Sequence, residues 1–455
     1  MKKMINNPRN LNIILLCGCI SFISSCDSLD DLLVVSNPSE LQESTIDDPA
    51  LTPTLINSIE GAMVDAYDYR IIWMGSMFTD QQITGVNWEQ TARLNQRIVN
   101  YDESTSSGMF AELHDLTVMA DMVVEKLKAG LIPNASSDAR TAYAQAYAGY
   151  GYIFLADILC ETNLKVQGTV YQPIEIYEMA KDRLKDALTI ASSAGDDDIQ
   201  NLARVGLARA NLNLGNYSEV ISNAGAVSPD FKWWVQYAGE DNPDAPGNNM
   251  WTSISGQNHR IGVHSTFLAG GPDNWLETDL EPFLTDPRVQ HWPYWRQGHN
   301  ALSPLYTPYQ GLRYSGYNGE TIADGGQPAE YERTDDILLA AFLSATHDYW
   351  EAIDEQGSDQ AGVLAFVNER RLVGNQEAVD LSGTDLTMEL RMQRGKDLFL
   401  GGFRLGDLRR WLRGGTDMFP SGAHPIAEWG EYGDATCFPI PLPEYDGNTN
   451  LSKPG

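Results

Sequence analysis

Leu207-Ala208-Arg209-Ala210-Asn211-Leu212-Asn213-Leu214-Gly215-Asn216-Tyr217 is the stretch that decides the fold of this 455-residue chain. Its apolar residues recur at helical spacing as far as Leu214, and the following glycine marks a turn. Tyr217 then opens a second apolar stretch. The small residues Ala208 and Ala210 allow two antiparallel helices to approach closely. The stretch therefore predicts a helical hairpin.

This pattern is typical of a tetratricopeptide helix pair, and helical spacing continues on its N-terminal side throughout residues 51–227. One helix is predicted around Phe110 and ends near Gly130 and Pro133. A second is predicted to begin at the cap Ser137 and a third at Pro173. A fourth is predicted over 197–214. The repeat is clear in one unit and degraded elsewhere, so we expect a mainly α, tetratricopeptide-like array of helical hairpins.

The pattern changes over residues 228–333, which contain ten of the 22 prolines and six of the eleven tryptophans. Long helices cannot run through so many prolines, so we expect a loop-rich insertion that packs on the helical array. Helical spacing resumes at Thr334 with apolar residues from Ile337 to Ile353, then over 358–372, and finally over 384–413. We expect 334–455 to hold C-terminal helices and a Pro- and Gly-rich tail, and 51–455 to form one compact unit.

The N-terminus is predicted to be an export signal. Three basic residues and no acidic ones precede or flank an apolar run over 11–23, which is too short to cross a bilayer as a helix. Ile23-Ser24-Ser25-Cys26 then resembles a bacterial lipobox. We therefore interpret 1–25 as a lipoprotein signal peptide, Cys26 as the acylated N-terminus and 26–50 as an acidic tether. Plain secretion, with Cys26 a chance residue, is the alternative.

Charge and cysteine content restrict the partners. The net charge is −31, which opposes binding to nucleic acid and to anionic lipid headgroups, so the lipid anchor is the only membrane contact we expect. Five cysteines are present, of which Cys17 and Cys19 lie in the signal. Cys160 and Cys437 remain, and they either form a disulfide or are two separate buried thiols.

A longer signature lies near the C-terminus. Gly402, Arg404, Asp407, Leu408, Arg410 and Trp411 form the pattern Gly-x-Arg-x-x-Asp-Leu-x-Arg-Trp, and Phe438-Pro439-Ile440-Pro441 follows, with Asn448 and Asn450 beyond it. These motifs resemble those of the SusD/RagB family of nutrient-binding outer-membrane lipoproteins, although the family usually has Glu at positions 393, 397 and 401. Arg404, Arg409 and Arg410 alternate with apolar residues, and we expect them to pair with carboxylates and hold the fold rather than touch a ligand.

The resemblance implies a SusD-like fold and a protein in the outer membrane, lipid-anchored and facing the exterior. It also implies a partner, a TonB-dependent transporter of the SusC kind, to which an oligosaccharide or sometimes a peptide is handed. Family ligand sites are aromatic platforms built from loops, and Trp and Tyr suit stacking on sugar rings. The predicted ligand residues are Trp73, Trp88, Trp275, Trp292, Tyr294 and Trp295, with Asp80, Gln81, Asn87 and Asn274 as hydrogen-bonding groups. Burial in the core is the alternative for each tryptophan, and Trp233, Trp234 and Trp411 are assigned to the core.

No catalytic motif stands out, so we do not expect an enzyme. The seven histidines include no His-Glu-x-x-His pair, and no Gly-x-Ser-x-Gly or phosphate-binding loop is present. We expect no cofactor and no metal. Calcium could bind at Asp241, Asp244 and Asn248, or at residues 196–198, but a solvated turn and a helix N-terminus account for these residues better. Peptide binding, a scaffold without a ligand and a glycoside hydrolase remain open alternatives.

Overall fold

The computed structural model describes residues 46–453, with gaps at 85, 87, 166, 238–246, 254–260, 268–285, 290–331 and 427–428. The chain divides into two units, residues 1–52 and 53–455. In the first unit, the described residues form the single-turn helix η1 (Pro49–Leu51), which Asp48 caps by accepting a hydrogen bond from the backbone N–H of Ala50. The second unit carries the sites discussed below.

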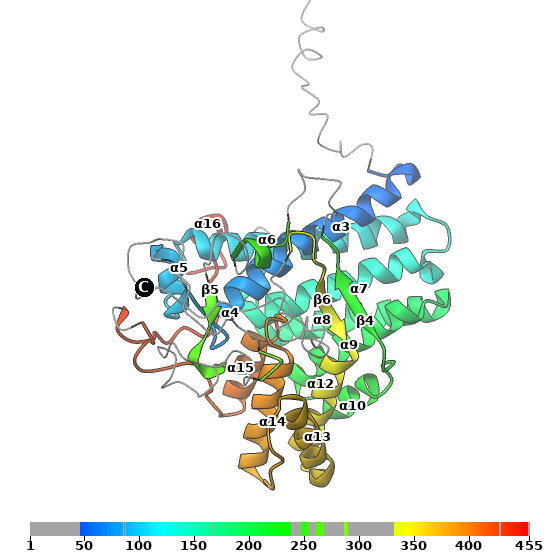
Figure 1. Ribbon diagram of the computed structural model, residues 1–455. Coiled ribbons are helices and arrows are strands. Elements are labelled where there is room, and N and C mark those ends of the chain that lie inside the picture. The colour runs from blue at the N-terminus through cyan, green and yellow to red at the C-terminus, as the bar shows by residue number, and fades with distance from the viewer. Residues whose placement is uncertain are drawn as a thin grey trace, which may run out of the picture. The chain divides into compact units, whose positions relative to one another are not determined.

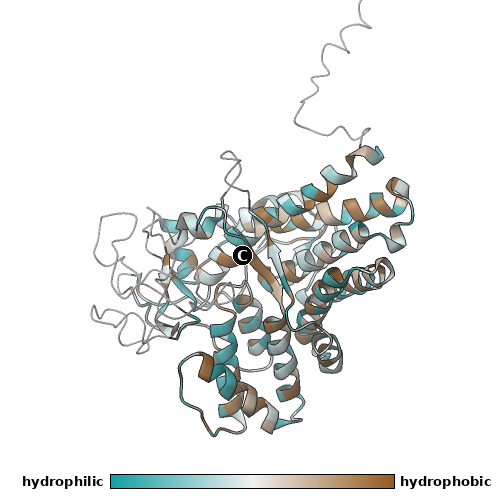
Figure 2. Ribbon diagram, turned by 45° about the vertical axis from the view of Figure 1, so that its right-hand side comes forward, coloured by the Kyte–Doolittle hydropathy of each residue, from teal (hydrophilic) through white to brown (hydrophobic). Residues whose placement is uncertain are grey.

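Helices make up most of the described part of the second unit (Figure 1). Its N-terminal helical elements are α3 (Thr52–Ala66), η2 (Tyr67–Met74), α4 (Gly75–Met77), α5 (Glu89–Asn95), α6 (Ser104–Lys126), η3 (Leu127–Leu131), η4 (Ala135–Ser137), α7 (Ala139–Ile158), α8 (Pro173–Ala194), α9 (Asp197–Leu214) and α10 (Tyr217–Ala224). The later ones are α11 (Asn249–Ser253), η5 (Ser265–Phe267), α12 (Phe342–Glu355), α13 (Gln360–Val373), α14 (Thr384–Asp397), α15 (Arg404–Arg413) and α16 (Leu442–Gly447). Hydrophilic and hydrophobic residues alternate along most of them (Figure 2), as expected for helices that bury one face.

Helices α6 to α10 pack in chain order, each against the next, and α10 and α9 also pack against α12. This confirms the predicted helical-hairpin array. Local signals define the hairpins: Pro173 occupies the first turn of α8, and Gly195 and Gly215 end α8 and α9 in the left-handed conformation, with φ of 73° and 74°. Helix α7 begins one residue later than an Ser137 cap would place it, because the side chain of Asp138 accepts the capping hydrogen bond from Arg140 N.

Six short strands form three antiparallel pairs within the described residues. They are β1 (Gln82–Thr84) with β5 (Ile261–Val263), β2 (Thr162–Asn163) with β3 (Val170–Tyr171), and β4 (Lys232–Val235) with β6 (Ile337–Ala341). The register of β4 on β6 runs from Lys232 opposite Ala341 to Val235 opposite Ile337, and it shifts between Trp233 and Trp234. β6 corrects a prediction, because residues 337–341 were expected to open a helix that in fact begins at Phe342.

The C-terminal helices also differ from the prediction in one place. Residues 384–413 were expected to form a single helix, but the structure has α14 and α15 separated at 398–403. Leu400 and Gly402 in this connection have positive φ values of 57° and 73°, which no continuous helix accommodates. A Cβ on Gly402 would lie 2.7 Å from Ile71 Cγ2, so the turn fits closely against η2.

Cys160 and Cys437 form a disulfide, with their Cα atoms 5.0 Å apart. The bond lies beside a parallel bridge between Leu159 and Phe438, in which Cys160 N donates to Phe438 O at 2.9 Å. Of the two states that the sequence leaves open for these thiols, the structure therefore has the covalent one, and it ties the end of α7 to the C-terminal tail.

In the described part of the chain, no helix combines the length and apolarity needed to cross a membrane. The predicted signal peptide at 1–25, Cys26 and most of the 26–50 tether lie outside the described residues, as does most of the predicted insertion at 228–333.

Candidate functional site

Three of the predicted ligand residues are buried, which corrects their assignment. Trp73 lies in the π-helical segment η2, is 2% exposed and stacks on Tyr69 with ring centroids 4.6 Å apart. Asp80 and Gln81 follow α4 and are 4% and 2% exposed. A side chain buried to this extent presents no face to a polysaccharide, so these residues belong to the core.

Asp80 has a structural partner instead. Arg404, the first residue of α15, donates from Nε to Asp80 Oδ1 at 2.7 Å and from Nη2 to Asp80 Oδ2 at 2.6 Å. This bidentate arrangement is the geometry in which a guanidinium best matches a carboxylate. It joins α15 to the segment after α4, and it supports the prediction that Arg404 holds the fold.

Asp407 of the same signature is surrounded by arginines. Arg394 Nε donates to Asp407 Oδ2 at 2.7 Å, and Arg410 Nη2 lies 2.9 Å from Asp407 Oδ1. Burial alone would raise the pKa of Asp407, but Arg394 and Arg410 lower it, and the net pKa is well below the usual value. Arg410 also pairs with Glu351. The signature therefore builds a buried ion network.

Arg409 stabilises a helix end at a distance. Its Nη1 donates to the carbonyl oxygens of Ala156, Asp157 and Leu159, at 2.9, 2.8 and 3.0 Å, at the C-terminus of α7. These carbonyls lack partners within their own helix, and a cation there also opposes the helix dipole. Arg409 therefore has the structural role that the sequence predicts, although its partners are backbone carbonyls rather than the expected carboxylates.

Trp88 is the predicted platform that the structure leaves accessible. It is 40% exposed and directly precedes α5, where its carbonyl accepts a hydrogen bond from Ala92 N at 2.8 Å. Asn87, Asn274, Trp275, Trp292, Tyr294 and Trp295 lie outside the described residues. The structure therefore describes one exposed member of the predicted site.

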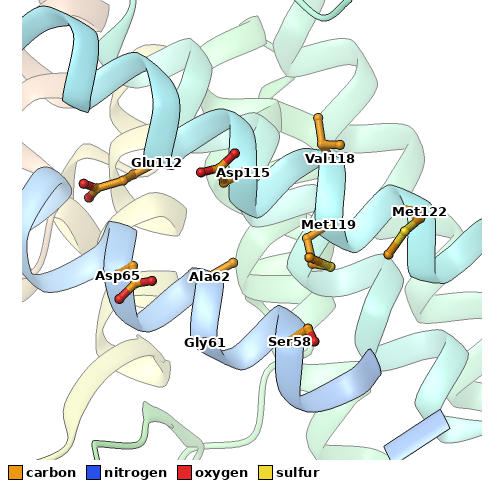
Figure 3. Close-up of a pocket in the computed structure, with 9 residues that line it drawn as sticks. All are labelled: Ser58, Gly61, Ala62, Asp65, Glu112, Asp115, Val118, Met119 and Met122. Atoms are coloured by element: carbon orange, nitrogen blue, oxygen red, sulfur yellow. The ribbon is translucent and has the colours of Figure 1, made fainter. Parts of the chain in front are cut away.

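Sequence analysis missed a series of three adjoining pockets around α3. The first, of about 460 Å³, lies between α3 and α6 (Figure 3) and is lined by Ser58, Gly61, Ala62, Asp65, Glu112, Asp115, Val118, Met119 and Met122. Its apolar part holds Met119 and Met122, and its other end holds the three carboxylates. Burial, reinforced by the charges of Glu112 and Asp115, raises the pKa of Asp65. We call this cavity the acidic groove.

The second pocket, of about 240 Å³, shares Asp65 and Glu112 with the acidic groove and is also lined by Val64, Asp68, Tyr69, Gly247 and Asn249. Asp68 accepts hydrogen bonds from the backbone N–H and the side-chain amide of Asn249, which anchor α11 to η2. Burial raises the pKa of Asp68 to about 6, although these hydrogen bonds oppose the shift.

The third pocket, of about 290 Å³, shares Val64 with the second and is lined by Glu60, Val64, Tyr143, Tyr147, Lys232, Trp233, Trp234, Val235 and Gln236. We call it the aromatic pocket. Tyr143 and Tyr147, four residues apart on α7, stack with centroids 4.3 Å apart, and Trp233 lies 6.2 Å from Tyr143. Trp233 and Trp234 are both partly exposed. Trp234 packs against the buried cluster of Leu338, Ala341, Leu398 and Phe403, in keeping with its assignment to the core, whereas Trp233 lies beside Tyr143, which corrects its assignment. Trp411, at 1% exposed, confirms the assignment to the core.

Local sequence contained one signal for this pocket. Adjacent residues of a strand point to opposite faces, so two neighbouring tryptophans in β4 are both buried only where both faces of the strand are covered. The rest of the pocket depends on α7 and α3, far from β4 in the chain, and no local pattern predicts that contact.

Among the residues that the structure describes, no three His, Cys, Asp or Glu side chains are grouped so that they could hold a metal ion. Asp196, one of the calcium candidates, caps α9 by accepting from Ile199 N at 2.9 Å. Asn248 is bound to backbone groups, donating to the carbonyl oxygens of Glu332 and Asp335. Asp241 and Asp244 lie outside the described residues.

No family model matches the chain, and neither does any curated protein. Solved structures do. A SusD superfamily protein from Bacteroides vulgatus ATCC 8482 matches with a TM-score of 0.64 and 13% identity, over 89% of this chain and all of the other. A putative sugar binding protein from the same organism matches with a TM-score of 0.63 and 16% identity, over 90% and 99% of the two chains.

A laminarin-binding SusD-like protein also matches, with a TM-score of 0.54 and 13% identity, over 90% of this chain and 99% of the other. The chain thus has the fold of the SusD superfamily.

Proposed function

We propose that this protein is a surface lipoprotein that binds an oligosaccharide or polysaccharide and delivers it, chemically unchanged, to a TonB-dependent transporter of the SusC kind. The observation that carries the proposal is the match along nine tenths of the chain to SusD-like structures, one of which binds laminarin. The lipobox at Cys26 supports a location at the outer membrane, where such a handover would take place.

The ligand site is proposed to include Trp88 together with the predicted residues outside the described part, which are Asn87, Asn274, Trp275, Trp292, Tyr294 and Trp295. Trp88 fits this role because its indole is exposed, whereas most large apolar side chains of the described chain are buried. An exposed aromatic ring can stack on the apolar face of a sugar ring. Trp73, Asp80 and Gln81 are not part of this proposal.

Calorimetric titration of a soluble version of the chain that begins at Asp27 tests the proposal. The titrants are laminarin, a panel of other neutral and acidic polysaccharides, and a mixed peptide digest. We expect saturable binding to a glycan with no release of reducing ends. Trp88→Ala should weaken binding about tenfold, as the loss of one stacking contact with its buried area implies. Trp251→Ala, which removes another exposed tryptophan on α11, is the matched control and should bind as wild type.

Peptide binding is the second candidate function, and the acidic groove favours it. The acidic groove has three carboxylates beside an apolar lining that includes Val118, which is 55% exposed. One of the carboxylates, Glu112, pairs with Arg70. Such a groove matches a peptide with a basic residue next to apolar ones. Saturable binding in the peptide arm only, lost in Asp115→Asn, would replace the glycan proposal with this one.

Partner and anchor need separate tests. Affinity purification of the full-length protein from detergent-solubilised outer membranes should recover a TonB-dependent transporter. Cys26→Ser should move the protein from the membrane fraction to the soluble exported fraction and remove labelling by palmitate, since acyl chains provide the anchor. Retention of Cys26→Ser in the membrane would contradict the anchor, and recovery of the protein without any transporter would contradict the handover.

A further inference from the structure

We propose that the aromatic pocket is a second carbohydrate site, which holds a single neutral sugar ring and is separate from the site at Trp88. This inference rests on the proposed function for the class of ligand and adds a location that the predicted residues did not include. Figure 1 shows α5, which follows Trp88, far across the second unit from β4, which carries Trp233 and Trp234.

Rigid elements hold the walls of the aromatic pocket. β4 is paired with β6, all five residues of which are buried, and nearly every side chain of α7 is buried as well. Tyr143 and Tyr147 are only 8% and 3% exposed, so they form the inner wall, while Trp233 is partly exposed at the mouth. Trp234 also lines the pocket, but it packs against the core cluster that includes Phe403. A wall fixed before binding loses little conformational entropy when a ligand enters.

Hydrogen bonds fix the ring orientations in the aromatic pocket. Trp233 Nε1 donates to Tyr147 Oη at 3.2 Å, and Tyr143 Oη donates to Glu60 Oε1 at 2.9 Å. Burial, together with the neighbouring phenol and Glu60, raises the pKa of Tyr143, and burial raises that of Tyr147. Both hydroxyl groups therefore stay protonated at any physiological pH and keep the indole and phenol rings in place.

The polar residues at the rim decide which ligand fits. Glu60 accepts hydrogen bonds, Lys232 donates them and Gln236 does both. A purely apolar ligand would cover these groups without replacing their hydrogen bonds to water, which is unfavourable. Glu60 and Lys232 carry opposite charges, so the rim favours neither a cation nor an anion, and the net charge of −31 opposes an anionic ligand. A neutral ring with one apolar face and several hydroxyl groups satisfies both the aromatic wall and the rim.

Size limits the ligand to about one ring. The cavity of about 290 Å³ is smaller than most pockets for drug-sized ligands, which range over about 300–1,000 Å³. A polysaccharide would therefore place one terminal or branching unit in the aromatic pocket.

The test measures the ¹⁹F NMR signal of Trp233 while sugars are added. The soluble chain beginning at Asp27 is labelled with 5-fluorotryptophan, and the ¹⁹F signal of residue 233 is assigned by its loss in Trp233→Phe. Glucose, other neutral hexoses and laminarin oligosaccharides are then titrated at millimolar concentrations. We expect the signal of residue 233 to shift saturably with at least one neutral hexose. No shift with any of these sugars would overturn the inference, and this readout requires no destabilising variant.

Variants then separate the two sites. Trp233→Ala should weaken the hexose interaction about tenfold, with the signal of Trp234 as a reporter, whereas Trp88→Ala and Trp251→Ala should leave it unchanged. A hexose response at residue 233 without saturable polysaccharide binding would support the pocket and contradict the proposed function. Polysaccharide binding without a response at residue 233 would support the proposed function and contradict the pocket.

Discussion

Arg404 and Asp80 form a buried bidentate ion pair although they lie 324 residues apart in the chain. Their side chains are 2% and 6% exposed. The pair fastens the first turn of α15 to the segment that links α4 to β1. It explains why a polar run that reads like a ligand-binding stretch in the sequence is part of the core.

Removal of either partner should destabilise the protein strongly. We expect Asp80→Ala and Arg404→Ala each to lower the free energy of unfolding by about 3–5 kcal/mol, because each leaves a buried charge without its partner. The double variant should lose clearly less than the sum of the two. Urea unfolding of the three variants measures this coupling in a double-mutant cycle.

Arg140→Ala is the matched control for the ion pair. Arg140 pairs with Asp138 at the surface, where the arginine side chain is 47% exposed, and Asp138 keeps its capping hydrogen bond to the backbone. The expected cost is at most about 1 kcal/mol. Equal costs for Arg140→Ala and Arg404→Ala would show that the buried pair has no special role.

The disulfide should contribute substantially to stability. Cys160 and Cys437 are separated by 277 residues, and closure of so long a loop restricts the unfolded chain by an amount on the order of 5–6 kcal/mol in the chain-entropy model. In the version beginning at Asp27, thiol titration under denaturing conditions should find no free thiol before reduction and two after it. The double variant with serine at both positions should unfold at clearly lower urea than wild type. Two reactive thiols before reduction would contradict the bond.

Asp68 gives the stability a pH dependence of known sign. Its pKa is raised to about 6 by burial, above the ordinary value of about 3.9, so the folded chain holds the proton more tightly than the unfolded chain. Its contribution to stability is therefore fully present below about pH 4 and is lost as the pH rises through about 6. Asp68→Asn does not titrate, so its stability relative to wild type should increase by up to about 3 kcal/mol between these limits.

Urea unfolding at closely spaced pH values measures this difference, and it cancels the titration of groups common to both proteins. Asn249→Ala supplies a second check, because it removes an amide donor that lowers the pKa of Asp68. In the Asn249→Ala variant, the stability that the protonated Asp68 contributes should therefore be lost at a higher pH than in the wild type. A difference between Asp68→Asn and wild type that does not depend on pH would show that the buried carboxyl does not titrate in this range.

Local signals predicted the helical array well. The start of α8 and the bounds of α9 match the expectation, because Pro173 and Gly215 act through their own backbone preferences. β6 was missed for the opposite reason. Ile337 to Ala341 are all buried, and a short apolar run without alternation does not distinguish a strand from a helix until its partner is known. That partner, β4, lies about a hundred residues earlier.

The candidate site also contains residues whose role the local sequence predicts and residues whose role it does not predict. The structural role of the signature arginines could be predicted because a guanidinium needs a carboxylate wherever it is buried. Burial of Trp73 is the alternative that the sequence offers for each tryptophan, but its stacking on Tyr69 within the π-helical segment η2 has no signal in the local pattern. The aromatic pocket depends on contacts among α3, α7 and β4, which no local pattern encodes.

The close approach of α7, α8 and α9 depends on two glycines that face one leucine. A Cβ on Gly149 of α7 would lie 2.5 Å from Leu184 Cγ, and a Cβ on Gly206 of α9 would lie 2.8 Å from Leu184 Cδ2. The side chain of Leu184 on α8 is fully buried between them. In Gly206→Ala, the clash should lower the free energy of unfolding by about 1–3 kcal/mol, which opposes the gain in helix propensity from glycine to alanine.

Gly61→Ala is the matched control, because Gly61 lies within α3 and its Cβ would meet nothing within 4 Å. It should stabilise the protein by about 0.5–1 kcal/mol. Leu184→Ala, which itself costs about 2–5 kcal/mol, removes the nearer obstruction and leaves Tyr150 Cε2 at 3.2 Å from the added Cβ, so Gly206→Ala should be clearly less destabilising in that background. If Gly206→Ala instead raises the unfolding midpoint of the otherwise unchanged chain as much as Gly61→Ala does, then Leu184 yields freely, and glycine is not what lets these helices approach.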